Sequence, residues 1–131
     1  MSAPLVLVAE DDDDILLLVT TRLRRDGFEV VAARDGDEAL ALAREQRPQV
    51  AVLDIGMPGL NGLEVLAEIR ADEELRGVRV LLLTAKAQES DARRGYSAGA
   101  DAYVRKPFSP TELSARVRAL VDDSPYADGA L

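Results

Sequence analysis

A short apolar run that ends in a carboxylate is the feature that most constrains the fold of this chain. Val50–Leu53 are all apolar and lead directly into Asp54, between Pro48 and a loop rich in glycine and proline. Such a run is typical of a strand that is buried on both faces of a parallel sheet. Asp54 would then lie at the carboxyl end of the strand, where open α/β sheets bind their ligands. Because aspartate also commonly begins turns, the other strand ends must decide between the two interpretations.

Segments of two kinds alternate along the whole chain. Short apolar runs predict strands, whereas apolar residues at helical spacing, preceded by capping residues such as Asp35 and Ser109, predict helices. The predicted strands cover residues 5–9, 29–33, 50–54, 78–84 and 102–104, and the predicted helices cover about residues 15–25, 35–47, 62–71, 88–98 and 109–121. This alternation predicts an α/β fold with a doubly wound parallel sheet, and right-handed crossovers restrict its topology.

The first predicted helix has an apolar face that is expected to pack on the sheet. The residues assigned to that face are Ile15, Leu18, Val19 and Leu23. Leu17 lies off the face and is expected to be exposed. The preceding acidic run is split between two roles, because Asp12 or Asp13 can cap the helix while Glu10 and Asp11 stay at the strand end.

Two segments are expected to be less ordered than the rest. The helix over residues 88–98 contains Gly95, which costs about 1 kcal/mol relative to alanine in a helix interior, so we expect this helix to be the most mobile one. A single domain is predicted over residues 1–121, followed by a flexible polar tail over residues 122–131.

The composition excludes several classes of function. The chain of 131 residues contains no cysteine and no histidine, which removes thiol chemistry, most metalloenzyme sites and histidine-based triads. A formal net charge of -8 disfavours direct nucleic-acid binding. The chain has no apolar run of the roughly 20 residues that a transmembrane helix needs, so no membrane insertion and a cytoplasmic location are expected.

Polar side chains lie at, or just after, the carboxyl ends of four of the five predicted strands. They are Glu10, Asp11, Asp54, Thr84 and Lys106. Because the carboxyl ends of parallel strands meet at one edge of a sheet, we expect these side chains to converge although they are far apart in the sequence. This convergence favours a functional site. Taken singly, Thr84 could simply end a strand and Lys106 could be an ordinary solvated lysine.

Four segments of the chain resemble the receiver domain of bacterial two-component response regulators. They are Val8–Asp12, Leu53–Gly62, Thr84–Ala85 and Gly99–Phe108, and the similarity extends from about Leu5 to Val121. The resemblance implies the flavodoxin-like (βα)5 fold with strand order 2-1-3-4-5. It also implies a phosphoprotein in phosphorelay signal transduction, in which Asp54 carries the aspartyl-phosphate.

The resemblance assigns a role to each candidate residue. Asp54 would be the nucleophile, and Glu10, Asp11, Asp54 and the carbonyl group of Gly56 would form the site for Mg²⁺, a hard ion that prefers oxygen ligands. Asp11 would bind the ion directly and Glu10 through water.

The remaining two roles concern the response to the phosphoryl group. Lys106 and Thr84 would contact this group, which the small side chain of Ala85 leaves room for. Tyr103, which could otherwise be ordinary packing, would act as a switch that turns inward when Thr84 moves toward the phosphoryl group.

The resemblance also implies the partners. A histidine kinase or histidine phosphotransfer protein would supply the phosphoryl group, and Leu17, on the helix beside the acidic site, is a candidate contact for that donor. Phosphorylation would then change contacts on the face made by the helix over residues 88–98, the strand of Tyr103 and the last helix. A downstream effector protein or a separate output domain would respond, and the chain would be a signalling domain rather than an enzyme.

Two alternatives remain. A degenerate receiver would act as a binding module without phosphorylation, but such proteins usually lack acidic or lysine positions that are all present here; failure to bind Mg²⁺ would favour it. An aspartate-nucleophile phosphatase of the haloacid dehalogenase type also uses Asp, Thr, Lys and Mg²⁺, and Asp11–Asp13 superficially provides its motif. That family places its nucleophile on the first strand, so detectable turnover of phosphate esters would be needed to favour it.

Overall fold

In the described part of the chain, five parallel strands form one sheet in the order β2-β1-β3-β4-β5. The structure is a computed structural model that describes residues 3–85 and 89–123. The strands are β1 (Leu5–Ala9), β2 (Glu29–Ala33), β3 (Val50–Asp54), β4 (Arg79–Thr84) and β5 (Ala102–Arg105). The predicted doubly wound sheet and its strand order are therefore confirmed.

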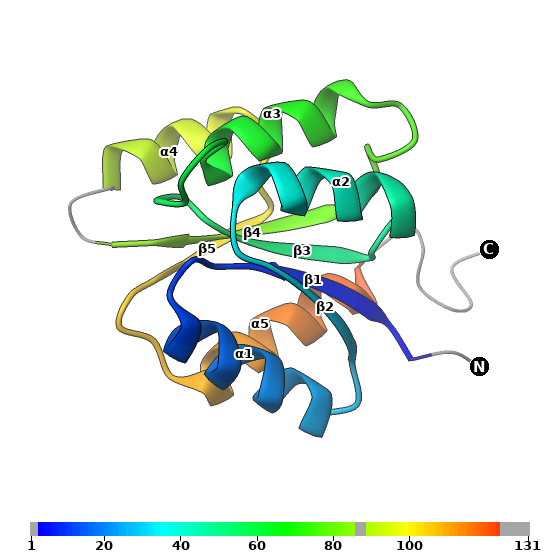
Figure 1. Cartoon of the computed structure of the whole chain (residues 1–131), viewed down its shortest axis with the longest axis vertical. Helices are drawn as coiled ribbons and strands as arrows, with labels where there is room; N and C mark the ends of the chain where they lie inside the picture. The colour runs from blue at the N-terminus through cyan, green and yellow to red at the C-terminus, as the bar shows by residue number, and fades with distance from the viewer. Residues whose placement is uncertain (1–2, 86–88, 124–131) are drawn as a thin grey trace.

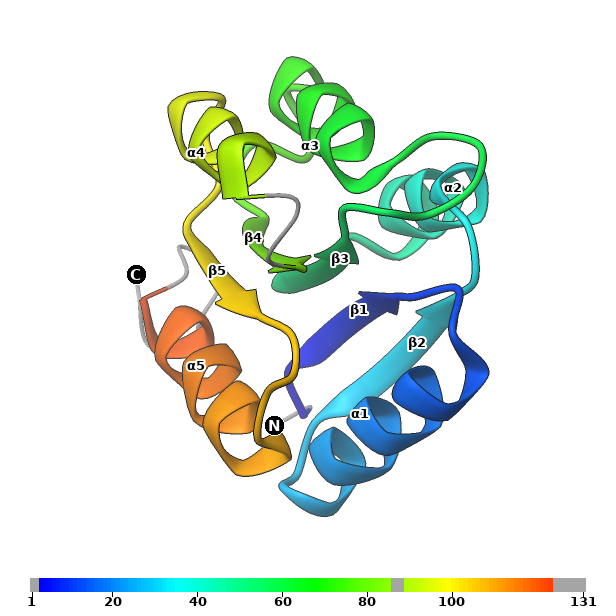
Figure 2. The same cartoon turned by 90° about the vertical axis from the view of Figure 1, so that its left-hand side faces the viewer.

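Within the described residues, five helices cover the two faces of the sheet. They are α1 (Asp13–Arg25), α2 (Gly36–Gln46), α3 (Gly62–Ala71), α4 (Glu89–Ser97) and α5 (Pro110–Asp122). Figure 1 shows α2, α3 and α4 on one face and α1 and α5 on the other, and Figure 2 shows the same layers from the side. Two apolar clusters fill the spaces between the sheet and these layers. None of the described helices is both long and apolar enough to span a bilayer.

The most apolar strands lie in the middle of the sheet. Every residue of β3 is buried, as are the last four residues of β1, because helices cover both faces of these strands. In β2, which is an edge strand, buried and exposed positions mix, as its less apolar sequence predicts. The central position of β3 fixes the backbone that carries Asp54.

Side-chain caps explain where most of the helices begin. Asp12 caps α1 by accepting hydrogen bonds from the backbone N–H groups of Asp14 and Ile15. Asn61 and Glu64 form a reciprocal capping box at α3. Asp35 caps α2 and Ser109 caps α5, as their positions in the sequence predicted.

The predicted inner face of α1 is partly wrong. The buried residues are Leu16, Val19, Thr20 and Leu23, while Leu18 is 49% exposed and Leu17 is 66% exposed. Five consecutive apolar residues, 15–19, are compatible with several helical faces and do not define one. The position that completes the buried face is Thr20, whose hydroxyl group donates to the Leu17 carbonyl oxygen and so tolerates burial.

The last helix ends close to the predicted boundary between the domain and its tail, and the domain boundary itself stays a prediction. Helix α5 continues to Asp122, one residue beyond the predicted domain boundary, and Asp123 forms its C-cap. Residues 124–131 of the predicted tail lie outside the described residues, as does Gln88 at the predicted start of α4.

Several glycines allow neighbouring elements to approach each other closely, and two of them, Gly95 and Gly62, bear on the site. A Cβ atom on Gly95 would lie 2.4 Å from Cδ1 of Leu82 and 3.1 Å from Cδ2 of Leu63, so this glycine lets α4 pack directly on β4 and α3. A Cβ atom on Gly62 would lie 2.6 Å from the carbonyl oxygen of Asp54. Gly95 was interpreted from the sequence as a weakness of α4, whereas the structure gives it a packing role.

We expect Gly62→Ala to destabilise the protein by about 2 kcal/mol or more, because backbone atoms of β3 cannot move aside as side-chain ends can. Gly95→Ala is the matched comparison: its added methyl group meets only the ends of leucine side chains, and alanine gains about 1 kcal/mol from helix propensity. Urea unfolding of the two variants should place Gly62→Ala clearly below Gly95→Ala in stability. The reverse order would contradict the packing described here.

Candidate functional site

The candidate site lies at the carboxyl edge of the sheet. Glu10 directly follows β1, Asp54 is the last residue of β3, Thr84 is the last residue of β4 and Lys106 directly follows β5. Four strands therefore each bring one of the polar side chains singled out from the sequence to this edge.

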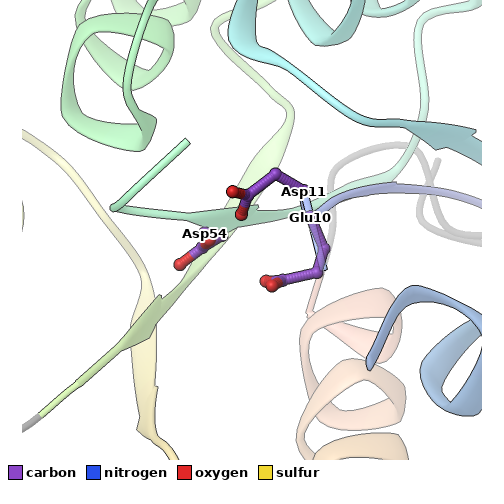
Figure 3. Close-up of side chains that lie close together, drawn as sticks. All are labelled: Glu10, Asp11 and Asp54. Carbon is purple, nitrogen blue, oxygen red and sulfur yellow. The ribbon is translucent and has the colours of Figure 1, made fainter. Parts of the chain in front are cut away.

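Three carboxylates at this edge face a common space. Oxygen atoms of Glu10, Asp11 and Asp54 all lie within 4.8 Å of one another, and Figure 3 shows the three side chains around one space. Glu10 and Asp54 are buried, whereas Asp11 is exposed. Within the described part of the chain, this is the group of acidic side chains that could hold a metal ion.

Lys106 joins two of these carboxylates. Its Nζ atom lies 3.1 Å and 3.0 Å from the two carboxylate oxygens of Glu10, and 3.3 Å from Oδ1 of Asp54. The side chain is about one-fifth exposed, so water screens these interactions less than on the surface. The peptide bond between Lys106 and Pro107 is cis.

Backbone donors also contact the carboxylates. The N–H group of Asp12 donates to Oε1 of Glu10 at 3.3 Å, and the N–H group of Gly56 donates to Oδ1 of Asp54 at the same distance. Gly56 lies in the turn after β3. That the carbonyl group of Gly56 binds the metal ion remains a prediction.

The electrostatic cost of gathering these groups appears in their pKa values. Burial raises the pKa of Glu10 to about 7, and the charge of Asp54 acts in the same direction, while Lys106 partly offsets both. Loss of hydration and a hydrogen bond with the Asp54 carboxylate raise the pKa of Asp11 above its ordinary value. The three carboxylates therefore carry more negative charge than Lys106 neutralises.

The pKa of Lys106 changes in the direction that favours its charged form. Burial alone would lower this pKa, but the hydrogen bond to Glu10 and the charges of Asp54 and Glu10 outweigh burial and raise it. Lys106 is therefore a permanent cation in the site at neutral pH.

Thr84 and Tyr103 lie on the same face of the sheet as α4. Tyr103 pairs with Leu82 in the ladder between β4 and β5, and Thr84 lies two residues further along β4. Thr84 is fully buried, and its hydroxyl group donates to the Ala85 carbonyl oxygen at 3.1 Å. Tyr103 is 38% exposed. Their proposed movement remains a prediction.

The structure brings Glu10, Asp11, Asp54 and Lys106 together, and places Thr84 at the end of the neighbouring strand. Sequence reasoning missed the contact of Gly62 with the Asp54 carbonyl group and the backbone donation by Asp12. Neither leaves a pattern in the sequence, because both depend on how loops close in space.

The donor set of the acidic cluster suits a hard divalent cation. Carboxylate oxygens are the ligands that Mg²⁺ and Ca²⁺ prefer, and a partly open cluster leaves room for the waters that Mg²⁺ retains. The raised pKa values of Glu10 and Asp11 show that added positive charge would be favourable here.

Comparison with known proteins identifies the family. The model of the response regulator receiver domain matches residues 6–118, so the chain belongs to this family. It is a signalling domain of the two-component type. The resemblance noted in the sequence, and the function it implied at the level of the family, are confirmed.

Relatives and solved structures agree with this assignment. The DNA-binding response regulator MtrA of Mycolicibacterium paratuberculosis is 43% identical over 123 residues, which are 92% of this chain and 53% of that protein. The probable transcriptional regulatory protein TcrX of Mycobacterium tuberculosis is 45% identical over 88% of this chain and 49% of its own length. The chain therefore spans about half the length of these relatives.

Among solved structures, the chemotaxis response regulator CheY4 of Vibrio cholerae superimposes with a TM-score of 0.85 at 30% identity, covering 91% of this chain and 99% of that one. A putative response regulator from Chloroflexus aurantiacus gives the same TM-score at 32% identity, covering 91% and 98%.

The pKa of Glu10 predicts a pH dependence of stability in the absence of metal. Between about pH 4.5 and pH 7 the folded state binds more protons than the unfolded state, so the contribution of Glu10 to stability decreases as pH rises through this window. Relative to Glu10→Gln, the free energy of unfolding of the wild type should decrease by on the order of 2 kcal/mol over this pH range.

Urea unfolding in EDTA at a series of pH values measures this difference. Glu73→Gln, which changes an exposed glutamate in the loop after α3, is the matched control and should parallel the wild type. If the difference between wild type and Glu10→Gln is constant from pH 4.5 to pH 7.5, Glu10 does not carry the electrostatic cost of the site.

Proposed function

We propose that Asp54 accepts a phosphoryl group in a Mg²⁺-dependent reaction and that Glu10, Asp11 and the Gly56 carbonyl group complete the metal site. The observation that supports this most is the position of the Asp54 carboxylate, which shares one small space with two other carboxylates and lies 3.3 Å from the ammonium group of Lys106. Phosphoryl transfer needs this combination of a positioned oxygen nucleophile and nearby positive charge.

The step is a transfer between two nucleophiles. A carboxylate oxygen of Asp54 forms a bond to phosphorus, the bond between phosphorus and the donor breaks, and the donor nitrogen or oxygen keeps the electron pair. Mg²⁺, when bound, supplies charge neutralisation for the oxygens in transfer. Lys106 contributes a second positive charge and stays protonated throughout.

A charge count shows how the net charge of the site would change on phosphorylation. Three carboxylates, one divalent cation and Lys106 give a neutral resting site. The phosphorylated site carries about one extra negative charge, because a dianionic group replaces the carboxylate charge. We infer that this excess draws the Thr84 hydroxyl group toward the phosphoryl group and that Tyr103 then turns inward.

The partners follow from this chemistry. A histidine kinase or histidine phosphotransfer protein would act as the donor, and a downstream effector protein or an output domain would respond to the face made by α4, β5 and α5. The relatives MtrA and TcrX are named as DNA-binding and transcriptional regulators. We propose that this acidic receiver chain does not itself bind nucleic acid and that it has no enzymatic activity beyond its own phosphorylation and dephosphorylation.

One structural observation disfavours the phosphatase alternative. Its motif would require Asp13 beside Asp11, but Asp13 is the first residue of α1 and forms an ion pair with Arg34 at 2.7 Å. The carboxylate that shares the site with Glu10 and Asp11 is instead Asp54, from the third strand.

Incubation with Mg²⁺ and acetyl phosphate, followed by intact mass measurement, should add one phosphoryl group to the wild type and none to Asp54→Asn, which has no carboxylate nucleophile. Glu10→Gln/Asp11→Asn should be modified much more slowly, as should the wild type in EDTA. Asp37→Asn, an acidic change in α2, is the control. A full mass gain in Asp54→Asn would show that the nucleophile is another residue.

An apolar groove along α1, bordered by the first residue of α5, suits a protein donor. Leu17, Leu18, Thr21 and Pro110 line it together with charged side chains of α1, and its volume is about 530 Å³. We expect Leu17→Glu to slow phosphoryl transfer from a cognate histidine donor at least tenfold, because a buried unpaired charge at an interface costs well over 1.4 kcal/mol. Transfer from acetyl phosphate should not change.

Stopped reactions with the phosphorylated donor protein measure this rate. Ala41→Glu is the matched control, because it places the same charge on an exposed position of α2, on the opposite face of the sheet. Equal transfer rates for Leu17→Glu and Ala41→Glu would exclude the α1 groove as the donor contact.

A further inference from the structure

Two exposed tyrosines contact each other between α4 and β5. The ring centroids of Tyr96 and Tyr103 lie 5.1 Å apart with an interplanar angle of 78°, which is an edge-to-face arrangement. We propose that Tyr96 is a positioning residue that holds Tyr103 outward and thereby sets how readily phosphorylation changes the face of α4, β5 and α5. This inference rests on the proposed phosphorylation of Asp54.

The sheet register defines where the Tyr103 ring can go. Tyr103 lies opposite Leu82, and Thr84 is two residues closer to the carboxyl edge on the same face of β4. Side chains in this diagonal relation are within reach of a long aromatic side chain. An inward Tyr103 ring would therefore lie toward Thr84 and toward the site.

The course of α4 puts Tyr96 on the other side of Tyr103. Helix α4 starts near the carboxyl edge, where Glu89 forms an ion pair with Arg105. It then passes over Leu82 at Gly95, where the backbone is so close that a Cβ atom would lie 2.4 Å from the leucine side chain. Tyr96 follows Gly95, so it lies farther from the site than Thr84 does. A Tyr103 ring that turns toward Thr84 must move away from Tyr96.

The contact between the two rings is therefore made only when the Tyr103 ring is in its outward orientation. Such aromatic pairs are worth roughly a twofold to twelvefold change in an equilibrium ratio beyond their buried area. A contact present in only one state shifts the equilibrium toward that state. Tyr96 thus opposes the inward orientation of Tyr103, and the opposing effect is small enough for a phosphoryl group to overcome it.

The experiment uses the 131-residue chain with Mg²⁺ and beryllofluoride, which mimics the phosphoryl group. If the inward state is the one that binds the mimic well, removing the opposing contact raises its population and the apparent affinity. Tyr96→Ala should lower the apparent Kd for beryllofluoride roughly twofold to twelvefold. Without the mimic, the amide NMR signals of β5 should already move part of the way toward their bound positions.

Matched variants separate this role from general packing. Tyr96→Phe keeps the ring and should behave as the wild type, and Ser97→Ala, at the next exposed position of α4, should do the same. Tyr96→Leu keeps apolar contact without an aromatic edge and replaces Tyr96→Ala if the latter folds poorly. In a Tyr103→Leu background, Tyr96→Ala should have no further effect on the apparent Kd.

Unchanged or weaker beryllofluoride binding in folded Tyr96→Ala or Tyr96→Leu would overturn the inference. So would an undiminished effect of Tyr96→Ala in the Tyr103→Leu background, because Tyr96 would then act through another group. Absence of beryllofluoride binding in the wild type would instead overturn the proposed phosphorylation of Asp54, and this inference with it.

Discussion

Repulsion among three carboxylates at one edge of the sheet is the constraint on which the rest of this structure depends. Glu10 and Asp54 are buried, so water solvates and screens their charges poorly. The pKa of Glu10, raised to about 7, reflects the free-energy cost of keeping its carboxylate ionised there. Lys106 contacts both groups but supplies only one positive charge. The fold therefore maintains an unfavourable charge distribution that a cation can relieve, which is how a preorganised site favours binding and reaction.

The apolar packing of the sheet makes this charge distribution possible. Strands β1 and β3, which lead into Glu10 and Asp54, lie inside the sheet, and each is covered on both faces. Gly62 brings the start of α3 against the Asp54 carbonyl group. The carboxylates cannot separate to reduce their repulsion without disrupting these contacts, because close-packed interiors resist small displacements.

Most of the fold could be predicted from the sequence, because short apolar runs and capping residues act locally. Asp12, Asp35 and Ser109 cap the helices as their side chains suggest. The inner face of α1 could not be predicted, since residues 15–19 are apolar on every side and Thr20 completes the buried face. To predict that Glu10, Asp54 and Lys106 converge, one must know the strand topology as well as where the strands end. The packing role of Gly95 could not be predicted, because it depends on contacts with two other elements, β4 and α3.

Helix α4 contacts β5 at two points, one near the charged site and one farther from it. Near the site it is joined to β5 by the ion pair of Glu89 and Arg105, and farther away by the contact of Tyr96 with Tyr103. Between them, Gly95 rests on Leu82, two residues before Thr84 on the same strand. Thr84 has no exposed surface, so any movement of its side chain must be accommodated by neighbours on this face. Among the described elements on this face, α4 and the edge strand β5 are the ones able to respond, because β3 and β1 are enclosed by helices on both faces.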